Sequence, residues 1–135
     1  MNLYDKDDGF KQFTLDEANT LLPEIIAATD NIVAELRDLE DRLRIEFDVD
    51  SSFAKQELEE ESAILLQKWA EVMVTLGVYP KGYFTVDFKS PVPDTLFCWT
   101  YGEKKITHTH KIYENFKERM PIQNNTMPGF EQSMN

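Results

Sequence analysis

The stretch FTLDEANTLLPEII, residues 13–26, marks the start of a long amphipathic helix. Thr14 is followed three residues later by Glu17, the spacing at which each side chain binds a free amide of the first helical turn in a capping box. Beyond it, one set of positions recurs at alternating steps of three and four residues, which keeps a single seam facing a partner helix. These positions are Leu22, Ile25, Thr29, Ile32, Leu36, Leu39 and Leu43. We therefore expect a first helix from Leu15 to about Phe47.

A second helix is expected after a short interruption. The sequence DVDSS, residues 48–52, holds turn-forming and N-capping residues, and helical spacing of apolar residues resumes beyond it. Gly77 suits a left-handed C-cap and Pro80 lies just beyond it, which places the second helix at about residues 53–76. Two helices joined by so short a connection run antiparallel and pack their seams together.

After Pro80 the hydrophobic pattern changes to the period of two that is typical of strands. It indicates three strands, at about residues 83–88, 95–101 and 106–112. A Gly-Glu-Lys-Lys turn before the third strand suits a hairpin. The strands therefore predict an antiparallel meander with one face on the helices.

The expected fold class is α+β: a long antiparallel helical hairpin packed with a small three-stranded antiparallel β-sheet and a short C-terminal turn over Glu114–Arg119. One domain is expected over residues 13–122, since the chain is of single-domain length. Residues 1–12 form a lead-in. Residues 123–135 have few periodic apolar positions, which is typical of a flexible tail.

Charge and composition exclude several kinds of partner. The formal net charge of −11 repels phosphate backbones and anionic lipid surfaces. No apolar run approaches the roughly 20 residues that span a membrane, and the acidic N-terminus does not resemble a signal peptide. The single cysteine, Cys98, cannot form an internal disulfide, which fits a reducing compartment. We expect a cytoplasmic protein without a nucleic-acid or membrane partner.

Both histidines of the chain lie in ITHTHKI, residues 106–112. Residues two apart on a strand share a face, so His108 and His110 could bind one metal ion. A zinc site needs at least a third protein ligand, and no spacing selects one among Asp87, Cys98, Glu103 and Glu114. Two histidines hydrogen-bonded to neighbours or water are the simpler interpretation. No metal or cofactor is therefore expected, with His108 and His110 kept as the alternative.

At two blocks the sequence resembles the domain of unknown function (DUF) 2203 family of bacterial proteins. The first is FTLDEANTLLPEI, residues 13–25, and the second is dispersed over the C-terminal half. Its matching positions are Val86-Asp87-Phe88, Leu96-Phe97-Cys98-Trp99, Gly102-Glu103, Ile106, His110, Phe116, Arg119 and Pro121-Ile122. The resemblance covers about residues 11–122 and implies no established activity, cofactor or partner.

The resemblance separates the two histidines, because His110 falls on the histidine of the family and His108 has no counterpart. The matching polar residues are Asp87, Glu103, His110 and Arg119. They could form a structural ion-pair network that fixes the C-terminal segment on the sheet. They could instead form a small anionic-ligand site, in which Arg119 binds a carboxylate or phosphate and His110 exchanges a proton.

Three functions remain open from the sequence. The leading hypothesis is a non-enzymatic interaction or assembly module, a homodimer or the binder of another protein, that uses the helical hairpin and an aromatic strand face of Phe97, Trp99 and Tyr101. The alternatives are a protein or enzyme with a polar site around His110 and Arg119, and a metal-binding protein. No nucleophile elbow, P-loop or glycine fingerprint supports an enzyme, which favours the non-enzymatic hypothesis.

Overall fold

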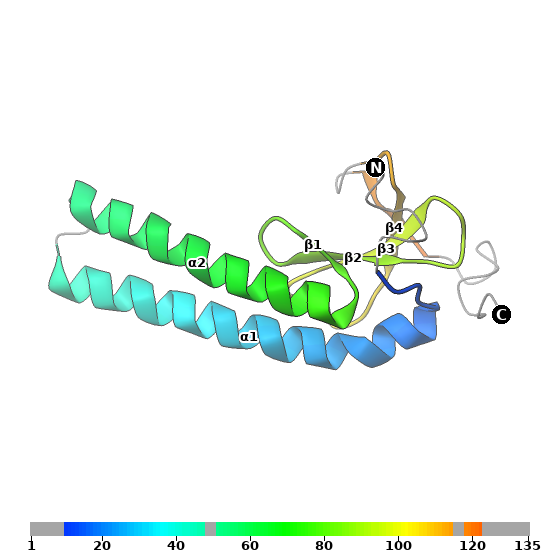
Figure 1. The fold of residues 1–135 in the computed structure, drawn as a ribbon, viewed down its shortest axis with the longest axis horizontal. Coiled ribbons are helices and arrows are strands. Elements are labelled where there is room, and N and C mark those ends of the chain that lie inside the picture. Colours follow the sequence, from blue (N-terminus) through cyan, green and yellow to red (C-terminus); the bar gives the residue numbers. More distant parts are fainter. Residues whose placement is uncertain (1–9, 48–50, 115–117, 123–135) are drawn as a thin grey trace.

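A computed structural model describes residues 10–47, 51–114 and 118–122 of the chain. It shows an α+β fold of two helices and one antiparallel sheet (Figure 1). The elements are α1 (Leu15–Glu46), α2 (Ser52–Leu76), β1 (Tyr79–Lys81), β2 (Thr85–Lys89), β3 (Thr95–Thr100), β4 (His108–Lys111) and β5 (Met120–Pro121). The predicted flexible tail, residues 123–135, and most of the lead-in lie outside the described residues, as does the middle of the predicted C-terminal turn.

α1 begins at a capping residue that the sequence indicates, and α2 both begins and ends at one. The Thr14 amide donates to Glu17 Oε1 at 2.8 Å and the Glu17 amide donates to Thr14 Oγ1 at 3.1 Å, which confirms the capping box. Ser51 caps α2 through a bond from the Ala54 amide, and Gly77 ends α2 in the left-handed conformation with φ at 92°. Glycine is the residue that takes this conformation without steric cost.

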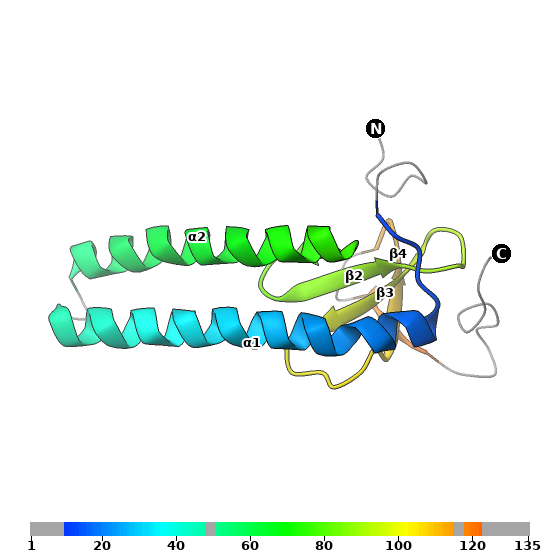
Figure 2. The ribbon, with the colours of Figure 1, turned by 60° about the horizontal axis from the view of Figure 1, so that its bottom comes forward.

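The two helices run antiparallel and side by side, as Figures 1 and 2 show. Apart from the buried Thr29, their seam is apolar, with Leu39 and Leu43 of α1 and Ala54 of α2 buried near the tip. The sheet lies at the end where α1 begins and α2 ends, so the tip of the hairpin projects away from it (Figure 2). Neither helix carries an apolar stretch of the length and hydropathy that crossing a membrane requires, among the residues that the structure describes.

The sheet has five strands in the order β1-β2-β3-β4-β5, all antiparallel, so the prediction of three strands was wrong. The additional strands are the outermost ones, of three and two residues, and each contains a proline, Pro80 in β1 and Pro121 in β5. Proline cannot donate to a ladder and is confined to such edges. Segments this short show no period of two, which is why the pattern did not reveal them.

The segment before α1 connects the helix to the sheet. The Lys11 amide donates to the Gly77 carbonyl at 3.2 Å, and the Phe13 amide donates to the Lys89 carbonyl at 2.8 Å. Inside α1, the Asn19 side chain accepts a hydrogen bond of 2.8 Å from the Ile106 amide in the loop before β4. The start of α1 is therefore held at three places, and two of the residues involved, Phe13 and Asn19, belong to the opening motif of the sequence.

The hydrophobic core lies between the helices and one face of the sheet. Side chains from β2 and β3 pack on buried side chains of α1 and α2, among them Leu22, Ile25, Trp69, Met73, Val86, Phe88, Phe97 and Trp99. Phe97 and Trp99 are fully buried, so they do not form the aromatic surface predicted from the sequence. The helices cover the face of β3 on which these two rings lie. Tyr101, the third residue of that prediction, remains 37% exposed.

Candidate functional site

The polar residues predicted from the sequence form two pairs, of which the first joins β2 to β4. His110 Nε2 lies 3.0 Å from Asp87 Oδ1, and the side chains are only 6% and 2% exposed. In the strand register Asp87 lies opposite Cys98 and His110 lies opposite Leu96. Because side chains alternate across a sheet, this row lies on the face opposite the core residues Val86 and Trp99.

The hydrogen bonds of His110 indicate its charge. Its Nδ1 lies 2.8 Å from the carbonyl oxygen of Lys111, which can only accept, so Nδ1 carries a proton. Its Nε2 faces the Asp87 carboxylate, which favours a second proton and a cationic imidazole. The hydrogen bond to Asp87 is the main cause of the raised His110 pKa, and burial opposes it. Lys81 Nζ lies 3.8 Å from the other oxygen of Asp87 and also opposes the increase in pKa.

The second pair connects the turn after β3 to the C-terminal segment. Arg119 Nη2 donates to Glu103 Oε2 at 2.7 Å. The other oxygen of Glu103 accepts from the Thr100 amide at 2.9 Å, and the Glu103 carbonyl accepts from Trp99 Nε1 at 2.7 Å. Glu103 is therefore held by the end of β3 and positioned to bind the guanidinium group.

Cys98 on β3 lies between these two pairs. Burial raises the pKa of its thiol to about 12. The Arg119 guanidinium lowers that pKa through its charge and a hydrogen bond, whereas the Asp87 and Glu103 carboxylates raise it. Asp87 of the first pair and Glu103 and Arg119 of the second are therefore within electrostatic reach of one sulfur atom. From the sequence, Cys98 was considered as a candidate metal ligand; the pairing of β2 with β3 places it opposite Asp87.

This cluster of Asp87, Cys98, Glu103, His110 and Arg119, here called the polar cluster, balances its own charges. Each cationic group faces a carboxylate of the chain, so an anionic ligand would have to displace Asp87 or Glu103. The thiol at its centre is protonated at neutral pH, and a protonated thiol is not a nucleophile. The arrangement corresponds to the structural ion-pair network considered above. Removing one partner of such a buried pair is costly, because the other charge remains buried.

Among the residues that the structure describes, no third ligand joins the two histidines to hold a metal ion. His108 Nδ1 lies 2.8 Å from Thr107 Oγ1, while both ring nitrogens of His110 face the partners given above. Within residues 10–47, 51–114 and 118–122, no group of three or more histidine, cysteine, aspartate or glutamate side chains is placed to hold a metal ion.

Exposed apolar side chains lie on the helical hairpin as well as around the sheet, where Tyr83, Tyr113 and Met120 are exposed. On α2 they are Phe53, Ile64, Val72 and Val74, and on α1 the most exposed is Ile45. Ile64 is 67% exposed, whereas Leu65 and Leu66 beside it are partly buried against the core. The sequence signal for this exposed apolar residue is the run Ile64-Leu65-Leu66. A helix that packs on one side only does not need three consecutive apolar residues.

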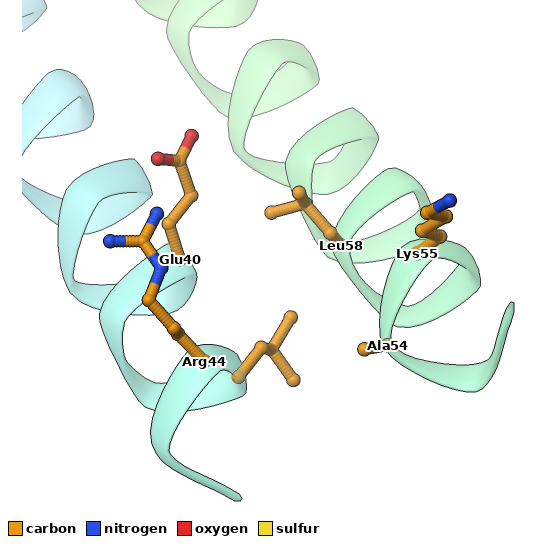
Figure 3. Close-up of a pocket in the computed structure, with 6 residues that line it drawn as sticks. Glu40, Arg44, Ala54, Lys55 and Leu58 are labelled. Carbon is orange, nitrogen blue, oxygen red and sulfur yellow. The ribbon is translucent and has the colours of Figure 1, made fainter. Parts of the chain in front are cut away.

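Two hollows open along the seam of the projecting part of the hairpin. Figure 3 shows the smaller, about 220 Å³, in which Glu40 and Arg44 of α1 stand near one another, Ala54 and Leu58 of α2 face the gap, and Lys55 points away. The larger hollow, about 360 Å³, is here called the acidic groove. Its lining residues are Glu35, Asp38, Leu39, Arg42, Glu61, Ile64 and Leu65. The α1 residues that line the acidic groove lie on a different side of the helix from those that line the hollow of Figure 3, so the two hollows open on different sides of the hairpin.

The chain belongs to the DUF2203 family, described as "Uncharacterized conserved protein", whose model matches residues 11–122. Comparison with curated proteins and with solved structures gives no match to either. The match extends over both helices and all five strands, and it includes every residue of the polar cluster.

Proposed function

We propose that this member of the DUF2203 family is a non-enzymatic interaction module that binds a protein through its projecting helical hairpin. The observation that carries the proposal is Ile64, an aliphatic side chain that is 67% exposed at the edge of the acidic groove. A single exposed apolar residue is ordinary. An exposed apolar residue beside a hollow with an apolar floor is what a protein-binding surface presents.

The distribution of apolar residues on α2 supports the same surface. A helix that only packs on α1 and the sheet needs apolar residues on that side and polar residues elsewhere. On α2, however, Phe53, Val72 and Val74 are exposed in addition to Ile64. These residues lie along an element that projects from the sheet, where a partner can reach it (Figure 1).

The polar cluster supports a non-enzymatic role. Its two cations are paired with carboxylates of the chain, and Asp87 and His110 are nearly inaccessible to solvent. A catalytic acid or base must come within hydrogen-bond reach of a substrate. The cluster instead binds strands to one another and fixes Arg119 on the turn after β3.

Site-specific photo-crosslinking in the cells that make the protein tests this proposal. A photoreactive amino acid is placed at Ile64 and, in a matched control, at Tyr113, which is 78% exposed but lies after β4. We expect a protein adduct at position 64 that is absent or much weaker at position 113. The adduct is identified by mass spectrometry as a second copy or as another protein. Equal labelling at both positions, or no adduct at position 64, would contradict the proposal.

A further inference from the structure

The hairpin carries most of the charge of the chain. Residues 15–46 and 52–76 hold 14 acidic and five basic residues, a net charge of −9 out of −11. The remaining 78 residues therefore carry a net charge of only −2. The element that projects from the sheet is thus also the strongly acidic part of the molecule.

The acidic groove combines this charge with an apolar floor. Leu39 is buried and Leu65 partly buried, while Ile64 forms an exposed apolar edge. Arg42 Nη2 of α1 donates to Glu61 Oε2 of α2 at 2.8 Å, which neutralises that pair. Glu35 and Asp38 also line the groove, and its basic residue, Arg42, is already paired with Glu61. A ligand that fits must bring an apolar surface and positive charge together.

The backbone around the groove decides the conformation of that ligand. Both walls are helices, whose backbone amides and carbonyls are bonded within the helix. A peptide that binds as an added β-strand gains its affinity from main-chain hydrogen bonds to an open sheet edge, and a groove with two helical walls offers none. A helix satisfies its backbone internally and presents apolar side chains at steps of three and four residues along one side.

We infer that the acidic groove binds a basic amphipathic helix of another protein, an inference that rests on the proposed function and specifies the partner. Its apolar side lies on Leu39, Ile64 and Leu65, and its lysine or arginine side chains face Glu35 and Asp38. A second copy of this chain fits poorly, because two hairpins of −9 each would face one another. Nucleic acid and anionic membranes are repelled for the same reason.

Designed helical peptides test the inference on the full chain. The probe is a fluorescent four-turn peptide with leucines at positions i, i+3, i+4 and i+7 and lysines on the opposite side. One control has the same composition in an order that scatters the leucines, and another has glutamate in place of lysine. We expect fluorescence anisotropy to show a dissociation constant at least about tenfold lower for the probe than for either control.

Matched variants of the protein locate the binding surface. We expect the double variant Glu35→Lys/Asp38→Lys, and separately Ile64→Ser, to weaken binding of the probe by roughly tenfold. The double variant Asp16→Lys/Glu24→Lys changes the net charge by the same amount on an earlier part of α1, and Tyr113→Ser removes an exposed aromatic residue after β4, outside the hairpin. Both control variants are expected to bind within about twofold of the unaltered chain.

Two results would overturn the inference. One is equal weakening by both charge variants, which would mean attraction to overall charge. The other is equal binding of the lysine and glutamate peptides. A crosslink from position 64 to a second copy, without selective binding of the basic probe, would leave the proposed function standing and remove this inference. Absence of both the crosslink and selective probe binding would remove both.

Discussion

The indole N–H of Trp69 on α2 donates a hydrogen bond of 2.9 Å to the hydroxyl oxygen of Thr29 on α1, and both side chains are buried. The same hydroxyl donates its own hydrogen to the Ile25 carbonyl at 2.7 Å. The Thr29 hydroxyl thus accepts a hydrogen bond from α2 and donates one within α1. Because a buried indole N–H requires an acceptor, this bond favours one register of the two helices over neighbouring registers.

The variant Thr29→Val should test the value of that bond. Valine keeps the shape of the side chain but leaves the Trp69 N–H without its acceptor, so we expect the free energy of unfolding to fall by about 1–3 kcal/mol. Thr20→Val is the matched control, since Thr20 also donates to the carbonyl four residues earlier but is exposed. Urea denaturation should show a change within about 0.5 kcal/mol for this control. Equal losses in the two variants would show that the interhelical bond is not the cause.

The pair of Asp87 and His110 should make stability dependent on pH. The folded state raises the His110 pKa above its ordinary value of 6.5, chiefly through the hydrogen bond to Asp87. The folded state therefore holds this proton more tightly than the unfolded state. Its contribution is fully present below pH 6.5 and is lost as the pH rises through the higher folded-state pKa.

Urea denaturation at a series of pH values from 6 to 8.5 measures that contribution. We expect the free energy of unfolding of the unaltered chain to decline over this range relative to His110→Gln, which cannot titrate at this position. His108→Gln is the control, because His108 bonds Thr107 and not Asp87, and it should keep the dependence of the unaltered chain. Parallel profiles for the unaltered chain and His110→Gln would refute the assignment.

Cys98 should be unreactive in the folded protein. Its thiol is fully buried, and with a pKa of about 12 only about one part in ten thousand is thiolate at pH 8. We expect a disulfide reagent such as dithionitrobenzoate to react with the native protein orders of magnitude more slowly than with the protein in denaturant. Because Cys98 is the single cysteine, Cys98→Ala gives the background of the assay. Rapid stoichiometric labelling of native protein would disprove burial of this thiol.

Asn19 should be needed for the connection between α1 and the loop before β4. The variant Asn19→Ala leaves the Ile106 amide without its side-chain acceptor, and we expect a loss of roughly 1–3 kcal/mol in the free energy of unfolding. Asn19→Asp keeps an acceptor oxygen and should recover most of that loss. Asn31→Ala, an exposed asparagine of the same helix, provides the background change. If Asn19→Asp is as unstable as Asn19→Ala, the hydrogen bond is not what matters at this position.

Sequence reasoning identified the helices because their signals are local. The capping box of Thr14 and Glu17 and the left-handed Gly77 depend on residues within one turn, and both are confirmed. Thr29 was predicted to lie in the seam between the helices because of its spacing alone. Its hydrogen bond with Trp69 joins residues 40 positions apart, a distance over which periodicity carries no information.

The sheet and its surfaces were harder to predict because they depend on contacts distant in sequence. All of Leu96, Phe97, Cys98 and Trp99 are buried, and an apolar strand of this kind does not show which of its faces the helices cover. Phe97 and Trp99 were therefore assigned to an interaction surface, although they belong to the core. The loop residue Ile106 was assigned to a strand, although β4 begins at His108.

The polar cluster could be predicted in part. Asp87, Glu103, His110 and Arg119 were chosen through the family resemblance, and the structure places them in two pairs around Cys98. No spacing in the sequence could show the pairing, because its members come from β2, the turn after β3, β4 and the C-terminal segment. The acidic groove was missed, since it is formed by residues from both helices that lie beside the seam and not on it.

The hydrogen bonds of Lys11 and Phe13 have a mechanical consequence for the hairpin. Through Gly77 and Lys89 they fasten the beginning of α1 beside the end of α2, so both helices are anchored at the same end of the molecule. The hairpin is therefore a cantilever: α1 alone, at 32 residues, reaches about 48 Å at 1.5 Å per residue. A sideways load on its projecting half produces the greatest bending moment at the clamp, where Asn19, Thr29 and Trp69 cross-link the structure. The buried bond between Thr29 and Trp69 and the bond between Asn19 and the Ile106 amide both lie in the half of the hairpin nearer the sheet, where they stiffen such a beam.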